Sequence, residues 1–170
     1  MANCPYCGAD IIQGLDECET CGQTLTDLSL PVPGSVVEKH LLSDRIEKLN
    51  PPQPSTVSAE TPVGDALKKM VAERIGCLIV ADGDQLLGIF TERDAVMKLN
   101  TDAARLAAKP ISEFMTPKPI TLAAQDKIVY ALHKMDVGGY RHIPILADKK
   151  LRGVISIRDI LGYLTDRIAR

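Results

Sequence analysis

The pattern of apolar and polar residues occurs twice along the chain, at an offset of 65 residues. Gly88-Ile-Phe-Thr-Glu-Arg-Asp94 returns as Gly153-Val-Ile-Ser-Ile-Arg-Asp159. In each copy a glycine precedes two apolar residues, a hydroxyl residue and, three positions later, an aspartate. The apolar run indicates a buried strand, and Thr/Ser-x-x-Asp is typical of a helix N-terminus. The unpaired backbone N–H groups at such a terminus favour anions, so the repeated motif is a candidate nucleotide site.

Other residues match at the same offset without a gap. Internal repetition of this kind predicts two copies of one structural unit. The matching pairs are Ile46 and Ile111, Pro52 and Pro117, Pro54 and Pro119, Thr56 and Thr121, Ala66-Leu67 and Ala131-Leu132, Lys69-Met70 and Lys134-Met135, and Leu86 and Leu151.

The first copy predicts the order β-α-β-β-α. A short strand near Thr56-Val57 precedes a helix that begins at Thr61-Pro62 and runs to about Arg74, because its apolar residues recur at helical spacing. Two strands follow at 77–80 and 86–90, and the turn Asp82-Gly-Asp84 joins them as a hairpin. A second helix begins near Thr91.

The second copy predicts the same order. Its strands are expected at 120–122, 140–146 and 151–157, and its last helix at 158–170. Residues 100–110 connect the copies, with a helical turn in 103–108. The fold class is therefore α+β, a tandem β-α-β-β-α pair.

The region before the repeats predicts a linker and a leading helix. Residues 25–35 contain two prolines and a glycine without helical periodicity, which indicates a linker. Ser35-Val-Val-Glu38 is a capping-box signature, and apolar positions continue on one helical face to Leu49. The predicted organisation is 1–24, a small metal-binding domain; 25–35, linker; 36–99, first copy with its leading helix; 100–110, connection; and 111–170, second copy.

Composition and charge indicate where in the cell the protein is expected and which kinds of partner are disfavoured. The 170 residues are 45% hydrophobic with a net charge of −2, and no apolar run approaches the roughly 20 residues of a membrane span. The N-terminal residues lack the basic and apolar regions of a signal peptide, so we expect a cytoplasmic protein without a membrane partner. The net charge gives no general attraction to nucleic acid.

Four of the five cysteines form a candidate metal site. Cys4-Pro-Tyr-Cys7-Gly8 and Cys18-Glu-Thr-Cys21-Gly22 each space two thiolates so that both reach one tetrahedral metal ion. The segment is too short for a core, and metal binding would supply the folding free energy. The two Cys-x-x-Cys-Gly knuckles resemble a rubredoxin-type zinc ribbon, so we expect structural Zn²⁺. Bound iron and a pair of disulfides remain as alternatives.

The tandem unit resembles a pair of CBS motifs, the Bateman module, over about residues 36–170. Besides the repeated motif, the resemblance rests on Phe114-Met115-Thr116, on 76–80 and on 141–144. It implies two motifs around a pseudo-twofold axis, with clefts that bind AMP, ADP, ATP or a related adenosyl compound. It also implies a regulatory protein rather than an enzyme, and a homodimer formed through the CBS helices.

The resemblance assigns the nucleotide-binding residues. Asp94 and Asp159 match the ribose-binding carboxylate, although each could instead cap its own helix. Arg141-His142 stands where the first copy has Gly76-Cys77, so our hypothesis is that the second copy binds a phosphorylated ligand more tightly. The complete set is Gly76, Cys77, Thr91, Arg93, Asp94, Arg141, His142, Pro144, Ser156, Arg158 and Asp159.

Two other functions compete with the sensor. A zinc ribbon can read nucleic acid, but residues 1–24 contain four acidic residues and no Lys or Arg, which disfavours phosphate backbones. The ribbon is better suited to docking an unidentified protein. Alternatively, the pair is a ligand-free dimerisation or scaffold module. The Ile160, Leu164 and Ile168 face could serve the dimer or close the intramolecular core. No catalytic residue is predicted.

Overall fold

The computed structural model describes residues 2–11, 17–25, 35–83, 85–148 and 150–168. The chain divides into two compact units. Unit 1 comprises residues 1–51, 122–145 and 155–170, and unit 2 comprises residues 52–121 and 146–154. No helix in the described ranges is long and apolar enough to cross a membrane.

The elements follow the predicted order in both copies. The strands are β1 (Ala2–Asn3), β2 (Asp10–Ile11), β3 (Thr56–Val57), β4 (Cys77–Asp82), β5 (Gln85–Thr91), β6 (Thr116–Pro117), β7 (Leu122–Ala123), β8 (His142–Ala147) and β9 (Lys150–Ser156). The helices are α1 (Val36–Ser43), α2 (Val63–Glu73), α3 (Glu92–Asp94), α4 (Ala103–Leu106), α5 (Ile128–Gly138) and α6 (Ile157–Ile168). Short 3-10 helices occupy Ile46–Leu49, Asn100–Asp102 and Ile111–Glu113, and a π-helix occupies Ala95–Leu99.

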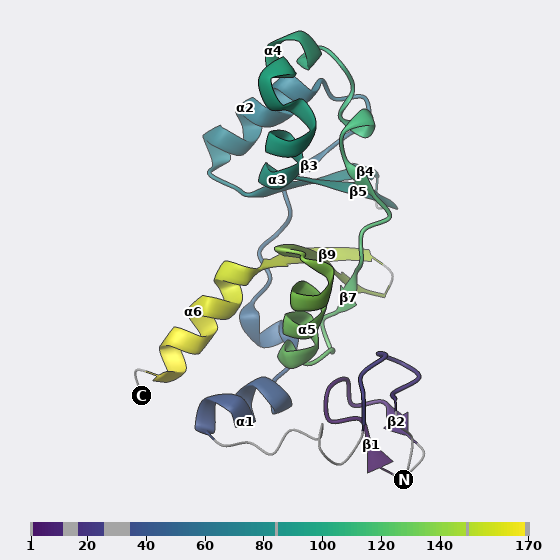
Figure 1. Cartoon of the computed structure of the whole chain (residues 1–170), viewed down its shortest axis with the longest axis vertical. Helices are drawn as coiled ribbons and strands as arrows, with labels where there is room; N and C mark the ends of the chain where they lie inside the picture. Colours follow the sequence, from purple (N-terminus) through teal and green to yellow (C-terminus); the bar gives the residue numbers. More distant parts are fainter. Residues whose placement is uncertain (1, 12–16, 26–34, 84, 149, 169–170) are drawn as a thin grey trace. The chain divides into compact units, whose positions relative to one another are not determined.

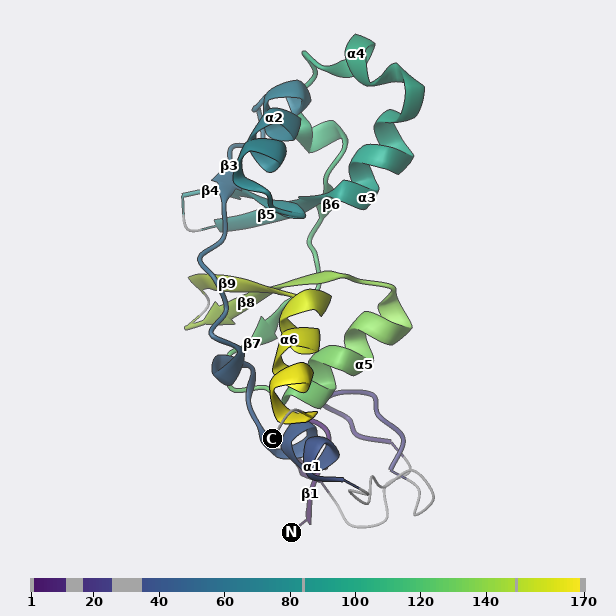
Figure 2. The ribbon, with the colours of Figure 1, turned by 90° about the vertical axis from the view of Figure 1, so that its left-hand side faces the viewer.

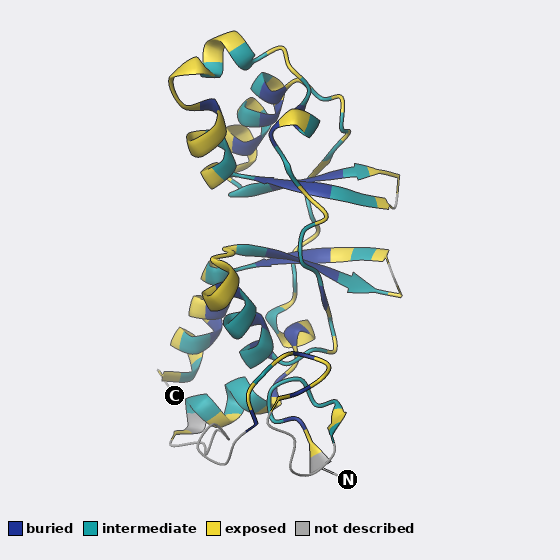
Figure 3. Ribbon diagram, turned by 45° about the vertical axis from the view of Figure 1, so that its right-hand side comes forward, coloured by how far each residue is buried: buried dark blue, intermediate teal, exposed yellow. Residues whose placement is uncertain are grey.

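Unit 2 is built on a four-stranded sheet in the order β3-β4-β5-β6. β4 pairs with β3 in parallel and with β5 in an antiparallel hairpin, and β5 pairs with β6 antiparallel. Helices α2, α3 and α4 lie on one side of this sheet (Figures 1 and 2). The buried apolar residues of α2 pack against the strands, whereas α3 and α4 have no buried residue (Figure 3). The fully buried members of this core include Val63, Leu78, Val80, Phe90 and Ile111.

Unit 1 contains α5 and α6 from the second copy together with α1, which contacts both of them. The second sheet has the order β7-β8-β9. The core is aliphatic, as expected for a chain with no Trp and two Phe. Its fully buried side chains are Ile46, Ile128, Ala131, Ile143, Ile145, Ile155 and Ile160.

The two copies exchange their leading segments. Ile46 N–H, in the first copy's leading segment, donates to Asp126 C=O in the second copy at 2.9 Å. The matching bond, at the same 65-residue offset, joins Ile111 N–H to Thr61 C=O at 2.8 Å. Because Ile46 and Ile111 are both fully buried, each leading segment completes the core of the other copy. Unit 1 therefore combines the first leading segment with most of the second copy. Unit 2 combines the second leading segment with the first copy and with residues 146–154.

The leading helix is shorter than the apolar pattern predicts. It ends at Ser43, Asp44 and Arg45 are extended, and a 3-10 helix follows at Ile46–Leu49. The break turns the Asp44 carboxylate inward, where it accepts a hydrogen bond from Tyr163 Oη. The tertiary partner of Asp44 thus overrides the local helical periodicity.

Other boundaries differ by small amounts. Pro62, not Thr61, is the N-cap residue of α2, because the Pro62 carbonyl accepts the first helical hydrogen bond, from Ala66 N–H at 3.1 Å. Ile160 is fully buried, so it closes the core and cannot belong to a dimer face, whereas Ile168 is 74% exposed. Most of the predicted linker, at 26–34, lies outside the described residues, as does Asp84 of the predicted turn.

Candidate functional site

The four cysteine sulfurs of the N-terminal segment converge on one point. All four lie within 4.8 Å of one another, and the distances from Cys4 Sγ to Cys21 Sγ and from Cys7 Sγ to Cys18 Sγ are both 3.7 Å. Zn–S bonds of about 2.3 Å in a tetrahedron put sulfurs about 3.8 Å apart, whereas a disulfide bond is about 2.05 Å long. The sulfur positions therefore fit a tetrahedral four-thiolate metal site and not two disulfides.

Two tight turns produce this convergence. Gly8 N–H donates to Cys4 C=O at 2.9 Å, and Gly22 N–H donates to Cys18 C=O at 2.7 Å. Both glycines have positive φ angles, +76° and +68°, which a residue with a Cβ rarely adopts. The turn after each Cys-x-x-Cys pair thus requires glycine, because its backbone has a positive φ angle at that position.

The protonation of the thiols shows what the site requires. Burial raises the pKa of Cys7 to about 11 and also raises that of Cys21. Burial opposes ionisation of Cys18 too, but backbone groups of Cys21 and Thr20 hydrogen-bond its sulfur and lower its pKa to about 7. A bound cation is needed to hold Cys7 and Cys21 as thiolates, and Zn²⁺ supplies that charge when bound.

Helix α5 lies against this cysteine cluster within unit 1. Tyr130 packs on the apolar cluster formed by Cys4, Cys18, Cys21 and Leu25. Lys127 Nζ donates to Pro5 C=O at 3.4 Å, and Lys134 Nζ approaches Cys21 C=O at 3.5 Å. The segment has no Lys or Arg of its own, so α5 supplies the cations beside a site that would carry net negative charge.

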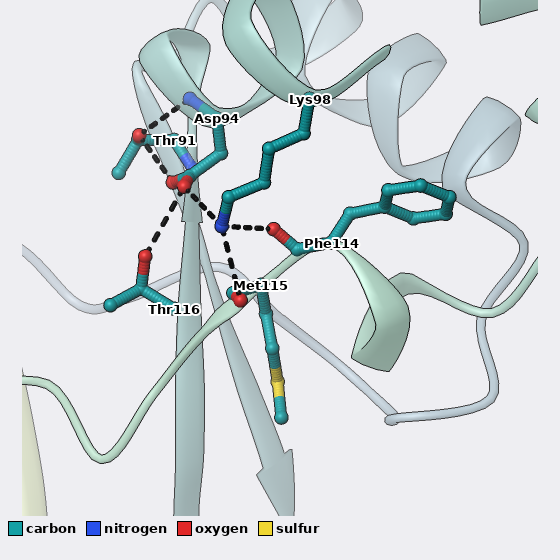
Figure 4. A network of polar contacts seen from close by, with 6 residues as sticks. All are labelled: Thr91, Asp94, Lys98, Phe114, Met115 and Thr116. Atoms are coloured by element: carbon teal, nitrogen blue, oxygen red, sulfur yellow. Dashed lines mark hydrogen bonds and ion pairs between the residues drawn. The ribbon is translucent and has the colours of Figure 1, made fainter.

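The carboxylate of Asp94 is surrounded by four donors (Figure 4). Its Oδ2 accepts from Thr91 N–H at 3.0 Å and Thr91 Oγ1 at 2.6 Å. Its Oδ1 accepts from Thr116 Oγ1 at 3.2 Å and forms an ion pair with Lys98 Nζ at 2.7 Å. Burial alone would raise the pKa of Asp94, but the bonds from Lys98 and Thr91 outweigh it and lower the pKa.

The carboxylate of Asp159 has fewer partners. Its Oδ2 accepts from Ser156 N–H at 2.6 Å and from Ser156 Oγ at 2.7 Å, as Asp94 does from Thr91. Among the described residues, its Oδ1 has no hydrogen-bond or ion-pair partner. The difference follows from the sequence, because Tyr163 and Pro51 occupy the positions that correspond to Lys98 and Thr116.

The repeated glycine has a steric reason in the first copy. A Cβ on Gly88 would lie 2.4 Å from Met115 Sδ and 2.9 Å from Thr116 C=O. Gly88 pairs across the sheet with Pro117 of β6. The close approach of β6 brings Thr116 to Asp94, so the glycine helps to assemble the polar network.

The start of one strand lies beside the start of a helix in both copies. In the first, Gly76 C=O accepts from Glu92 N–H at 3.1 Å, and Cys77 pairs across the sheet with Thr91. In the second, Arg141 C=O accepts from Ile157 N–H at 3.0 Å. The sequence-predicted residues are therefore brought together within each copy, around Asp94 and around Asp159.

The side chains of these residues differ in exposure. Arg93, Arg141 and Arg158 are exposed, and Pro144 is buried in β8. His142 and Cys77 are half-buried. The second copy thus has two exposed guanidinium groups, Arg141 and Arg158, on the segments that meet at Asp159, and the first copy has only Arg93 in the corresponding places.

Sequence reasoning missed Lys98 and Thr116. It also missed the contacts to the cysteine segment from Tyr130 and Lys134 of α5 and from Lys127, the N-cap residue of that helix. The spacing of Asp94 and Lys98, four residues apart at a helix start, was an available signal for an ion pair. The other contacts join residues far apart in the sequence, and no local pattern indicates them.

Comparison with known proteins matches two copies of the CBS domain, at residues 46–100 and 111–166. The chain is 31% identical over 126 residues to CBS domain-containing protein CBSCBSPB1 of Arabidopsis thaliana, a region that covers 74% of this chain and 23% of that protein. The chain therefore spans about a quarter of the length of that curated relative.

Solved structures share the fold. A CBS-domain containing protein from Agrobacterium tumefaciens is 27% identical with a TM-score of 0.67, over 71% of this chain and 98% of that one. A CBS domain protein from Pyrobaculum aerophilum, complexed with AMP, is 24% identical with a TM-score of 0.62, over 72% of this chain and 99% of that one. The second likeness establishes the fold alone.

Proposed function

The chain belongs to the CBS domain family, and from this premise we propose that it is a non-catalytic regulatory protein that binds an adenosine-containing ligand. The ligand class comprises AMP, ADP, ATP and related adenosyl compounds. The observation that carries the proposal is the Asp159 carboxylate, whose Oδ1 has no partner in the described part of the chain. A ribose diol is a pair of donors that such an oxygen can accept.

The residues around Asp159 suit the remainder of a nucleotide. Ser156 lies at the N-terminus of α6, a 12-residue helix whose first N–H groups favour phosphate. Arg141 and Arg158 are exposed and can form charge-assisted bonds to phosphate oxygens. The AMP bound to the Pyrobaculum aerophilum protein supports this ligand class.

The N-terminal segment acts as a structural zinc ribbon in this proposal. The sulfur geometry supports a four-thiolate metal, and four free thiols in a short segment suit the reducing cytoplasm, where we locate the protein. The acidic residues of the ribbon favour a protein partner over nucleic acid.

We extend the proposal to a homodimer formed through the CBS helices. Val96 and Leu161 occupy matching positions after the two repeated aspartates, and they are 69% and 55% exposed. Met97, beside Val96, is 71% exposed. Large apolar side chains in these positions favour burial against a second copy.

Calorimetric titration of the full chain with AMP tests the ligand. Asp159→Asn should weaken AMP binding at least about tenfold, because the variant loses the charged acceptor of the ribose hydroxyls. Asp166→Asn is the matched control, since Asp166 is exposed on the same helix, and its affinity should equal that of the unmodified chain. Absence of AMP, ADP, ATP and S-adenosylmethionine binding at millimolar concentration would overturn the proposal in favour of a ligand-free scaffold.

A further inference from the structure

We infer that Lys98 occupies the Asp94 carboxylate of the first copy in place of a ribose hydroxyl. Each chain would therefore bind one nucleotide, at the Asp159 carboxylate of the second copy. The inference rests on the proposed function, because it concerns the same ligand and the same pair of aspartates. It adds a residue that determines how many sites are open.

The two carboxylates differ in the number of acceptor positions that the protein already uses. An ionised carboxylate offers about four lone-pair sites. Asp94 uses all of them, for Thr91 N–H, Thr91 Oγ1, Thr116 Oγ1 and Lys98 Nζ. Asp159 uses two, both for Ser156. A ribose hydroxyl needs an acceptor position that no protein donor already uses, which Asp159 offers and Asp94 does not.

The Lys98 ammonium group is held by a complete set of acceptors. An ammonium group has three donors, and Lys98 Nζ finds three acceptors: Asp94 Oδ1 at 2.7 Å, Phe114 C=O at 2.7 Å and Met115 C=O at 3.2 Å. The Asp94 side chain is only 12% exposed, so its pairing is less screened than that of a surface pair. A ribose would have to displace a cation that is fully bonded (Figure 4).

The second copy lacks this arrangement because different residues occupy the corresponding positions. Tyr163 stands where Lys98 stands in the first copy, and its hydroxyl is bonded to Asp44 instead. Pro51 stands in the place of Thr116 and has no hydroxyl to donate. The difference between the copies therefore lies in the residue types at four positions, Lys98 and Thr116 for the first copy and Tyr163 and Pro51 for the second.

A competing role for Lys98 is to bind the phosphate of a ligand at the first copy. The geometry disfavours this role, because the three donors of its ammonium group are engaged and its charge faces Asp94. The two roles predict opposite effects when Lys98 is replaced, since one blocks binding and the other assists it. Binding of a neutral ligand, adenosine, and of a charged ligand, AMP, distinguishes the two roles of Lys98.

The test is the stoichiometry of binding of adenosine and AMP to the full chain, measured by calorimetry and equilibrium dialysis. The unmodified chain should bind about one ligand and Lys98→Met about two, because the freed Asp94 oxygen then accepts a ribose hydroxyl. Lys68→Met is the matched control: Lys68 pairs with exposed Asp65, so this variant removes the same charge and should stay at about one. Lys98→Met with Asp94→Asn should also return to about one.

If Lys98→Met does not fold, Lys98→Gln provides a second variant, because the glutamine amide can still donate to the Phe114 carbonyl. The inference is overturned if either folded variant stays at one site, if the unmodified chain already binds two, or if AMP stoichiometry falls on replacing Lys98. If the Lys98 variants stay at one site and Asp159→Asn loses binding, the proposed function stands and only the role of Lys98 is refuted. No binding by the unmodified chain would remove both.

Discussion

Tyr163 donates a hydrogen bond from its hydroxyl to the carboxylate of Asp44, a residue 119 positions earlier in the chain. Asp44 is 6% exposed and also forms an ion pair with Lys48 Nζ at 2.6 Å. Arg167 stacks on the Tyr163 ring, 3.4 Å from its centroid, and lies 3.6 Å from the same carboxylate. These contacts fasten the leading helix α1 to the last helix α6 within unit 1.

Tyr163→Phe should lower the free energy of unfolding by about 2 kcal/mol, because the variant removes a hydrogen bond to a buried charge and keeps the ring. Urea unfolding followed by circular dichroism gives the change in midpoint. Lys68→Met, at an exposed ion pair, should leave the midpoint nearly unchanged. An unaltered midpoint in Tyr163→Phe would mean that the hydroxyl bond adds nothing to the α1–α6 contact.

Acid should destabilise the protein partly through Asp44. Burial alone would raise the pKa of Asp44, but the bonds from Lys48 and Tyr163 and the charge of His40 lower it below its usual range. A carboxyl whose folded pKa is depressed stabilises the fold above its unfolded pKa of about 3.9, and this contribution disappears as the pH falls through the folded pKa.

Asp44→Asn should therefore be less stable than the unmodified chain at neutral pH and lose less stability between about pH 5 and pH 2. Unfolding midpoints measured across this range provide the comparison. Parallel pH curves for the two proteins would show that Asp44 does not contribute to the acid transition.

Gly88 and Gly162 should respond in opposite directions to alanine. Gly88→Ala should destabilise the chain by about 1–3 kcal/mol, because a Cβ would meet the Thr116 carbonyl at 2.9 Å. Gly162→Ala should stabilise it by about 0.5–1 kcal/mol, because Gly162 lies inside helix α6 and its Cβ would meet no described atom within 4 Å. Thermal unfolding gives the change in melting temperature for each variant. Equal changes in the two variants would contradict the packing around β6.

Removal of the metal should weaken the protection of α5 amides from hydrogen exchange. Purified protein should contain about one zinc ion per chain, and a strong chelator should release it. Because Tyr130 packs on the cysteine cluster, hydrogen exchange of α5 amides should accelerate after release and slow again on adding zinc. The absorbance of an iron–thiolate centre would exclude zinc, and unchanged α5 exchange would contradict the contact.

Leu161→Asp should convert the proposed dimer into a monomer, since a charge would replace an apolar side chain that is 55% exposed. Light scattering after size exclusion measures the mass. Ala104→Asp, at another exposed helical position, is the control and should remain dimeric. A monomeric unmodified chain would refute the dimer.

Much of the fold could be predicted from the sequence alone, because its signals are local. The strands β4 and β5 follow from short apolar runs, and Thr91 and Asp94 form a capping box at the predicted helix start. The cysteine spacing indicated a metal site, and the sulfur positions fit one. The 65-residue repeat identified both candidate ligand-binding aspartates, although their use as ligand contacts stays a prediction.

The tertiary structure decided which residues those local elements meet. The exchange of leading segments, the inward turn of Asp44 and the packing of α5 on the cysteine cluster join residues far apart in the chain. The two copies share Thr/Ser-x-x-Asp, and the sequence treats their aspartates as equivalent. Only the fold brings Thr116 onto Asp94 and turns Tyr163 toward Asp44, because burial and long-range pairing, not periodicity, determine where these polar side chains find their partners.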